Sequence, residues 1–166
     1  MRMLVLAVFA SLFSLAPSLA QVTVPTTPDF IRTAAATDEF ERQAGRMADR
    51  QAASPRVRDF GRMMVRDHTD TTMALKQAIR RAGLPQPAPP TLTPDQQSSI
   101  VALRGLSGPS FDRTYMQQQV QTHLQALSMM RAYAHAGDNR VLRGAAQNTI
   151  PIVRRHLMMA NEIVRR

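Results

Sequence analysis

The sequence predicts an all-α protein built as a four-helix bundle. Four long segments carry apolar residues at intervals of three and four, which places these residues along one face of a helix. Short links join the first two segments and the last two, whereas a long link joins the second segment to the third. This order of short, long and short links is typical of a four-helix bundle.

The first two helices are predicted over residues 28–53 and 55–82. Thr27 offers a cap for the first helix, followed by a proline at its first position and an acid in its first turn. Ser54 and Pro55 repeat this start signal, and Gly83 ends the second helix. The residues expected to face inward on the second helix are Val57, Phe60, Met64, Leu75 and Ile79.

A proline-rich connector is predicted over residues 83–109. Five prolines between Pro85 and Pro94 forbid a continuous helix there. Thr93 and Gln96 match a capping box, which predicts a short helix within the connector that ends near Arg104. A connector of this length can travel along the whole bundle.

The last two helices are predicted over residues 110–136 and 139–166. Gly137 ends the third helix, Asp138 is expected to cap the fourth, and Pro151 predicts a kink within it. The residues expected to face inward are Phe111, Tyr115, Val120, Leu127 and Met130 on the third helix, and Leu142, Ala146, Ile152, Met159 and Ile163 on the fourth.

The first twenty residues have the pattern of a secretory signal peptide. Arg2 precedes an apolar run over residues 3–16, and the small residues Ser18 and Ala20 mark a cleavage site. The run has 14 residues, whereas a membrane span takes about 20. We therefore expect a signal peptide over residues 1–20, a tail over 21–27, a bundle domain over 28–166, and a periplasmic or secreted protein.

Composition excludes several classes of function. The chain of 166 residues has no cysteine, which rules out a disulfide framework and thiolate metal sites. Its formal net charge is +9, but the arginines are spread over every helix without a nucleic-acid motif. We expect them to form solvated helix faces that suit an anionic envelope surface, with no nucleic-acid partner. No arrangement of serine, histidine and acid predicts a hydrolase, and no catalytic motif predicts another enzyme.

Four polar residues are predicted to meet inside the bundle, one from each long helix. Glu41, His68 and His123 each lie 13 residues beyond the start of their helix, and His156 lies 17 residues beyond Asn139. At 1.5 Å per residue, their depths differ by at most about 6 Å. All four also fall on the inward stripes, so we expect them to converge at mid-bundle. The residues expected beside them, in positions to orient them, are Asp67, Tyr115 and Met64.

Four stretches of the chain resemble the successive motifs of the domain of unknown function 4142 family: AAATDEFERQAGRMA, VRDFGRMMVRDHT, GPSFDRTYMQQQVQTHL and TIPIVRRHLMMA. The resemblance implies an exported bacterial protein with a ferritin-like four-helix bundle. It also implies a role for five matching residues without implying an activity. These residues are Glu41, Asp67, His68, His123 and His156.

Three imidazoles and one carboxylate favour a single divalent transition-metal ion, such as zinc, copper or iron. Ferritin-like di-iron sites use a Glu-x-x-His motif, but Val65, Val120 and Val153 lie three residues before the histidines. A di-iron centre is therefore not expected. We expect metal binding, storage or a stress-related role, with release of the ion below about pH 6, as histidine becomes protonated. The alternative is a structural or interaction bundle, in which the same residues form a hydrogen-bonded network without metal.

Overall fold

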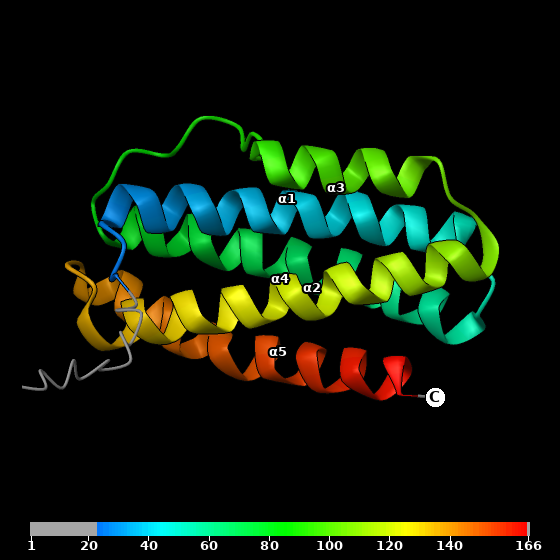
Figure 1. The fold of residues 1–166 in the computed structure, drawn as a ribbon. Helices are drawn as coiled ribbons and strands as arrows, with labels where there is room; N and C mark the ends of the chain where they lie inside the picture. Colours follow the sequence, from blue (N-terminus) through cyan, green and yellow to red (C-terminus); the bar gives the residue numbers. More distant parts are fainter. Residues whose placement is uncertain (1–22, 166) are drawn as a thin grey trace, which may run out of the picture.

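Residues 23–165 are described by a computed structural model, and the predicted signal peptide over residues 1–20 lies outside this range. The all-α class is confirmed, because the described chain forms five helices and no strand (Figure 1). No helix among these residues combines the length and the apolar character that a membrane span needs. The helices are α1 (Thr27–Gln51), α2 (Pro55–Arg81), α3 (Pro94–Arg104), α4 (Gly108–Ala136) and α5 (Arg140–Val164).

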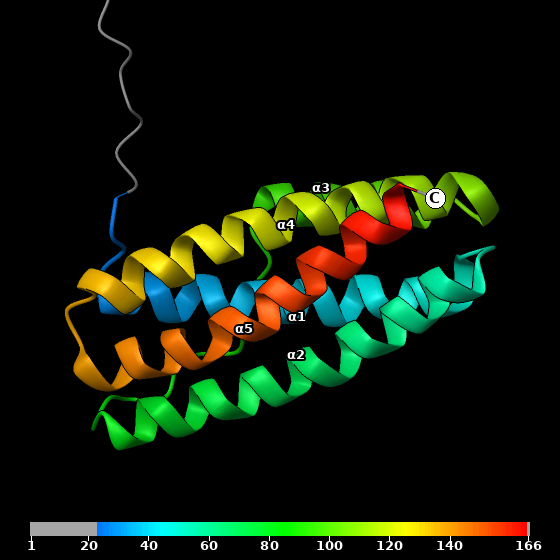
Figure 2. The same ribbon diagram turned by 90° about the horizontal axis from the view of Figure 1, so that it is seen from below.

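The four long helices form a ring in which each contacts two neighbours. Helices α1 and α5 each contact both α2 and α4. Helices α1 and α5 run in one direction, and α2 and α4 run in the other (Figures 1 and 2). Because α2 and α4 run the same way, the chain must return along the bundle between them. The segment over residues 82–93 and helix α3 make this return, with α3 packed on α1 and α4.

Helix α1 begins one residue earlier than the sequence predicts, because Thr26 caps it. The Thr26 hydroxyl accepts a hydrogen bond from the backbone N–H of Asp29 at 3.3 Å. Thr27 is therefore not the cap, and its side chain is buried inside the first turn. Two adjacent threonines satisfy the same capping rule, and only the tertiary contacts of Thr27 decide between them.

The predicted cap of the last helix is also wrong, because Asn139 rather than Asp138 caps α5. The Asn139 side chain accepts hydrogen bonds from two free backbone N–H groups in the first turn of α5, those of Val141 and Leu142. Asp138 instead accepts the hydroxyl of Thr27 at 2.5 Å, together with the Thr27 backbone N–H at 3.3 Å. Asp138 thus ties the start of α1 to the α4–α5 turn.

The other end of the bundle is joined by comparable contacts between a turn and a helix. The Asp112 carboxylate of α4 accepts the backbone N–H groups of Ala53 and Ser54 at 3.0 and 2.9 Å. Arg58 donates to the carbonyl oxygens of Ala52 and Ala53 at the end of α1. These bonds satisfy backbone groups that the ends of α1 and α2 leave without helical partners.

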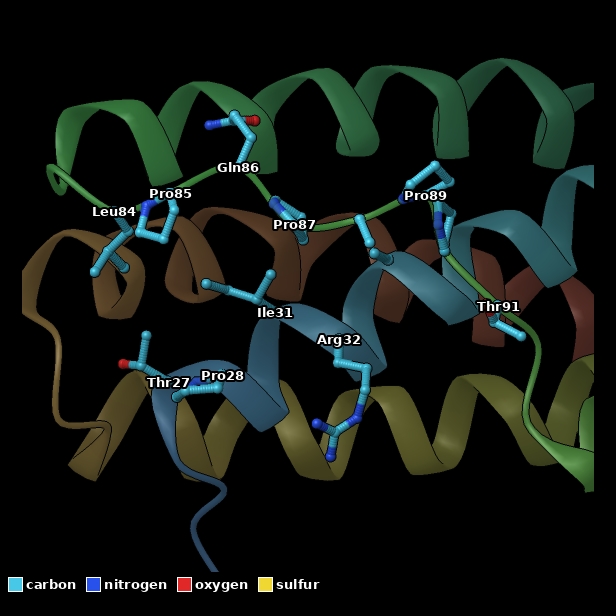
Figure 3. Close-up of a pocket in the computed structure, with 13 residues that line it drawn as sticks. Thr27, Pro28, Ile31, Arg32, Leu84, Pro85, Gln86, Pro87, Pro89 and Thr91 are labelled. Atoms are coloured by element: carbon cyan, nitrogen blue, oxygen red, sulfur yellow. The ribbon is translucent and has the colours of Figure 1, made fainter.

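The proline-rich segment lies over the start of α1 and encloses a cavity of about 440 Å³ (Figure 3). Proline rings, together with Ile31 and Leu84, give it a largely apolar lining. This cavity contains none of the predicted site residues. Its lining residues are Thr27, Pro28, Ile31, Arg32, Ala35, Leu84, Pro85, Gln86, Pro87, Ala88, Pro89, Pro90 and Thr91.

The apolar interior is divided into two clusters with a polar layer between them. On α2, Met64 belongs to one cluster and Leu75 to the other, and His68 lies between these residues. On α4, Met116 and Met130 belong to different clusters and flank His123 in the same way. The histidines therefore occupy one level of the bundle, where apolar packing is interrupted.

Close packing of α1 on α2 depends on two glycines. A Cβ atom on Gly61 would lie 2.7 Å from the carbonyl oxygen of Gly45, and one on Gly45 would lie 2.6 Å from that of Gly61. Both carbonyl oxygens belong to the backbone of a helix, so they cannot rotate away as a flexible side chain can. The two helices would have to move apart to admit either methyl group.

We expect Gly61→Ala to lower the free energy of unfolding by about 1–3 kcal/mol, because it overpacks this contact. The matched control is Gly144→Ala on α5, where nothing lies within 4 Å of the added Cβ atom. That change should raise the free energy of unfolding by about 0.5–1 kcal/mol through helix propensity. Urea unfolding followed by circular dichroism measures both, and equal effects of the two substitutions would contradict the close contact.

Candidate metal centre

Three histidines from three different helices meet in the polar layer. His68 comes from α2, His123 from α4 and His156 from α5, and all three are buried. One ring nitrogen of each residue lies within 4.8 Å of the corresponding nitrogens of the other two. The ring centroids are 5.2–5.9 Å apart. The structure thus brings together the three imidazoles that the sequence places at a common depth.

Each imidazole makes one hydrogen bond to an acceptor outside this group. His68 Nδ1 lies 2.9 Å from Asp38 Oδ1, and His156 Nε2 lies 2.8 Å from Asp67 Oδ2. His123 Nδ1 lies 2.8 Å from the backbone oxygen of Gln119, one helical turn earlier. Carboxylate and carbonyl oxygens accept hydrogen bonds, so the nitrogen that contacts each of them carries the proton.

These bonds assign the tautomer of each ring. In a neutral imidazole one nitrogen carries a proton, and the other has a free lone pair. The lone pairs of His123 Nε2 and His156 Nδ1 therefore face one another across 3.3 Å. The third such nitrogen, His68 Nε2, is buried and has no hydrogen-bond partner. When all three rings are neutral, three lone pairs therefore lie in the centre with no proton among them, an arrangement that a cation stabilises.

Asp38 also contacts the group of three histidines, through His68, although it was not expected there from the sequence. Its buried carboxylate accepts His68 Nδ1–H and also the hydroxyls of Thr71 and Thr72, each at 2.9 Å. A signal for it exists in the sequence, because Asp38 lies three residues before Glu41 and therefore on the same face of α1. Pairing with His68 depends on how α1 and α2 are rotated, which periodicity does not determine.

Asp67 lies beside the three histidines, where the sequence places it, but it contacts a histidine on another helix. It contacts His156 on α5 rather than its neighbour His68, and it also accepts a hydrogen bond from Arg155 at 2.7 Å. Partial burial opposes ionisation of Asp67, but the hydrogen bonds from His156 and Arg155 outweigh it and lower its pKa. The ion pair with Arg155 keeps the Asp67 carboxylate charged at the place where it contacts His156 Nε2.

Glu41 is fully buried but is not among the three residues whose ligand atoms converge. Its Oε2 accepts a hydrogen bond from Gln119 Nε2 at 2.7 Å, whereas its Oε1 has no hydrogen-bond partner. Gln119 thus joins Glu41 to His123 through its side chain and its backbone oxygen. Burial raises the pKa of Glu41 to about 7, although the charge of His68 opposes this shift. Its role as a metal ligand stays a prediction.

Tyr115 and Met64, the other expected neighbours, lie in the apolar cluster on one side of the histidines. The Tyr115 ring stacks on Phe111 at 5.7 Å, and its buried hydroxyl has no hydrogen-bond partner. Burial and the charge of Glu41 raise the pKa of Tyr115 well above its usual value. Met64 is fully buried among apolar residues, which is the packing role usual for methionine.

The three histidines differ in how readily they take a proton. Burial, together with the charges of His68 and His156, lowers the pKa of His123 to about 3. Burial also lowers the pKa of His156 to about 4, despite its bond to Asp67. Burial opposes the charged form of His68 as well, but Asp38, Glu41 and Asp67 outweigh it and raise the pKa of His68. Without a metal ion, the proton of this centre therefore belongs to His68.

Most of the chain matches one family model. Residues 14–163 align with the family described as domain of unknown function (DUF4142). The chain belongs to this family. No curated protein and no solved structure matches the chain. Membership in the family agrees with the four stretches that resemble its motifs, and it assigns no activity to the histidines.

In this DUF4142 protein, we expect the metal-free histidines to titrate separately. As the pH falls, His68 should gain a proton above pH 6.5, because its pKa is raised. His123 and His156 should stay neutral to about pH 5, because their pKa values are lowered to about 3 and about 4. Imidazole ¹⁵N chemical shifts measured by NMR follow each ring. Protonation of His123 above pH 6 would contradict the arrangement of donors described above.

Proposed function

We propose that this protein binds a single divalent transition-metal ion through His68, His123 and His156. The observation that carries the proposal is the convergence of three unprotonated ring nitrogens, each ring being held from behind by an acceptor. Acceptors behind metal-binding histidines are the usual arrangement, because they fix the tautomer and orient the ring. The proposed function is metal binding or storage.

The spacing of the nitrogens supports binding to one ion. Two nitrogens bound to zinc at 2.0–2.1 Å in tetrahedral geometry lie about 3.3 Å apart. His123 Nε2 and His156 Nδ1 already have this separation, at 3.3 Å. The ligand nitrogen of His68 lies within 4.8 Å of the other two, so binding would bring this ring closer to them.

The donor atoms favour zinc, copper or iron over magnesium and calcium. Imidazole nitrogens suit borderline transition metals, whereas magnesium and calcium prefer oxygen ligands. A three-nitrogen set leaves the fourth position for a water molecule or for Glu41. Glu41 Oε1 supports the second choice, because it is buried on a neighbouring helix and lacks a hydrogen-bond partner. The set is also unlike a di-iron site, which needs several carboxylates.

The charges around the centre support a divalent ion. Asp38 and Glu41 are both buried, and neither forms an ion pair with an arginine or the lysine in the described part of the chain. Buried carboxylates need a positive charge nearby, which a protonated His68 or a metal ion can supply. A divalent ion at the imidazoles balances both carboxylates once Glu41 releases its proton.

A second candidate function is a bundle whose polar layer fixes the register of the helices without metal. The observation that favours it is the raised pKa of His68, which lets one proton supply the positive charge that an ion otherwise supplies. In that case the His123–His156 contact and the Asp67–Arg155 ion pair are structural. Binding measurements separate the two functions directly.

We expect the purified protein, made without a histidine tag, to bind one equivalent of zinc in calorimetry. His123→Ala should abolish tight binding by removing a ligand, and Asp38→Asn should weaken it about 10- to 100-fold by releasing the His68 ring. The matched control is His135→Ala, because His135 is exposed and lies outside the centre. If zinc, copper and iron all fail to bind the wild-type protein, the metal proposal is wrong and the structural network remains.

We also propose that the protein is exported and that its signal peptide is cleaved after Ala20. The apolar run over residues 3–16 followed by Ser18 and Ala20 supports this proposal. Intact-mass measurement of protein expressed with its own leader should give a chain that begins at Gln21. A full-length chain that only detergent extracts would contradict it.

A further inference from the structure

A second, smaller cavity of about 220 Å³ lies among the four long helices, next to the histidine layer. Its mouth includes the exposed side chains of Asp70 on α2 and Asn148 on α5, two helices that lie side by side (Figure 2). Thr71 and Thr149 lie just inside them. The buried apolar residues of its floor are Phe30, Ala34, Leu75 and Met130.

The inner wall of this cavity is formed by residues that adjoin the metal centre. Asp38 lines the cavity and holds His68 Nδ1 at 2.9 Å. Ile152 lines it from α5 and lies one helical turn before His156. The cavity thus connects the protein surface to Asp38, which holds the His68 ring, and reaches within one helical turn of His156.

The charge of the cavity differs from that of the protein as a whole. Its lining contains two acids, Asp38 and Asp70, and neither arginine nor lysine. The chain as a whole has a formal net charge of +9, which disfavours the approach of cations. The cavity has a largely apolar floor, but the charged groups of its lining are both acids, so a cation can approach the interior along its polar side.

The other solvent-facing side of the centre is unfavourable for a cation. Asp67 is the residue behind His156, and its side chain is 19% exposed. Arg155 covers this carboxylate with a 2.7 Å ion pair, and its own side chain is 53% exposed. The groove between α2 and α5 at that end of the bundle is lined by Arg56 and Arg66 together with Asp59 and Glu162, so its charges are mixed.

We propose that the Asp70 cavity, defined by the lining residues named above, is the route by which the divalent ion reaches the three imidazoles. Asp70 attracts the hydrated ion at the mouth. The hydroxyls of Thr71 and Thr149 and the carbonyl of Asn148 replace water ligands as it moves inward. Asp38 receives it beside His68. This inference rests on the proposed metal binding and adds the path that the ion takes.

The first test changes the charge at the mouth. Stopped-flow absorbance of Co²⁺, which reports ligand nitrogens through its visible bands, measures the rate of uptake. We expect Asp70→Lys to slow uptake about three- to tenfold at low salt, an effect that shrinks at high salt. The matched control is Asp59→Lys, which makes the same charge change at an exposed position of α2 outside the cavity. Asp59→Lys should change the rate much less.

The second test narrows the cavity without changing its charge. Ala145→Leu places a larger side chain into the cavity from α5. Because a narrower path hinders the ion in both directions, uptake and release should slow by the same factor, and the equilibrium affinity should stay the same. The control is Ala126→Leu, at a half-buried position of α4 that does not line the cavity.

The outcomes distinguish the route from the function. If the wild-type protein takes up no Co²⁺ or Zn²⁺, the metal proposal fails and the route with it. If the wild type binds Co²⁺ while Asp70→Lys and Ala145→Leu take it up at the wild-type rate, only the route is wrong. In that case faster uptake by Arg155→Gln would place the route on the Asp67 side.

Discussion

Burial of three imidazoles in the middle of an apolar bundle is the constraint on which the rest of this structure depends. A buried polar group without a partner is costly, so each ring must find one on a neighbouring helix or on its own. Asp38, Asp67 and the Gln119 carbonyl supply these partners. Two of the three bonds cross between helices, so they fix how α1, α2 and α5 are rotated and where they lie along the bundle axis.

The same bonds determine the chemistry of the centre. Each acceptor is bonded to the outward N–H of a ring. In a neutral ring the inward nitrogen then has a free lone pair, which can bind a cation between the three rings. A set of imidazoles with the opposite tautomers would point three protons at one another and would repel a cation. The direction of these three hydrogen bonds thus decides whether a cluster of this composition can bind a cation or repels it.

The path of the chain between α2 and α4 decides which side of the bundle is covered. Since α2 and α4 run in the same direction, the chain must cross from one end of the bundle to the other, and α3 covers α1 and α4 on the way. The α2–α5 side has no such cover, and the Asp70 cavity lies there. The connector therefore does not cover the side of the bundle on which the proposed route opens.

The sequence by itself determined the helices and the depth and inward direction of His68, His123 and His156, because periodicity and caps act within a few residues. Tertiary structure decided what each polar group contacts. Thr27 and Asp138 both resemble caps locally, yet they bond to each other. Asp38 was missed and Glu41 lies outside the convergent group, because partners between helices depend on a rotation that no single helix specifies. The Asp70 cavity likewise depends on how the four long helices pack, because all four contribute to its lining.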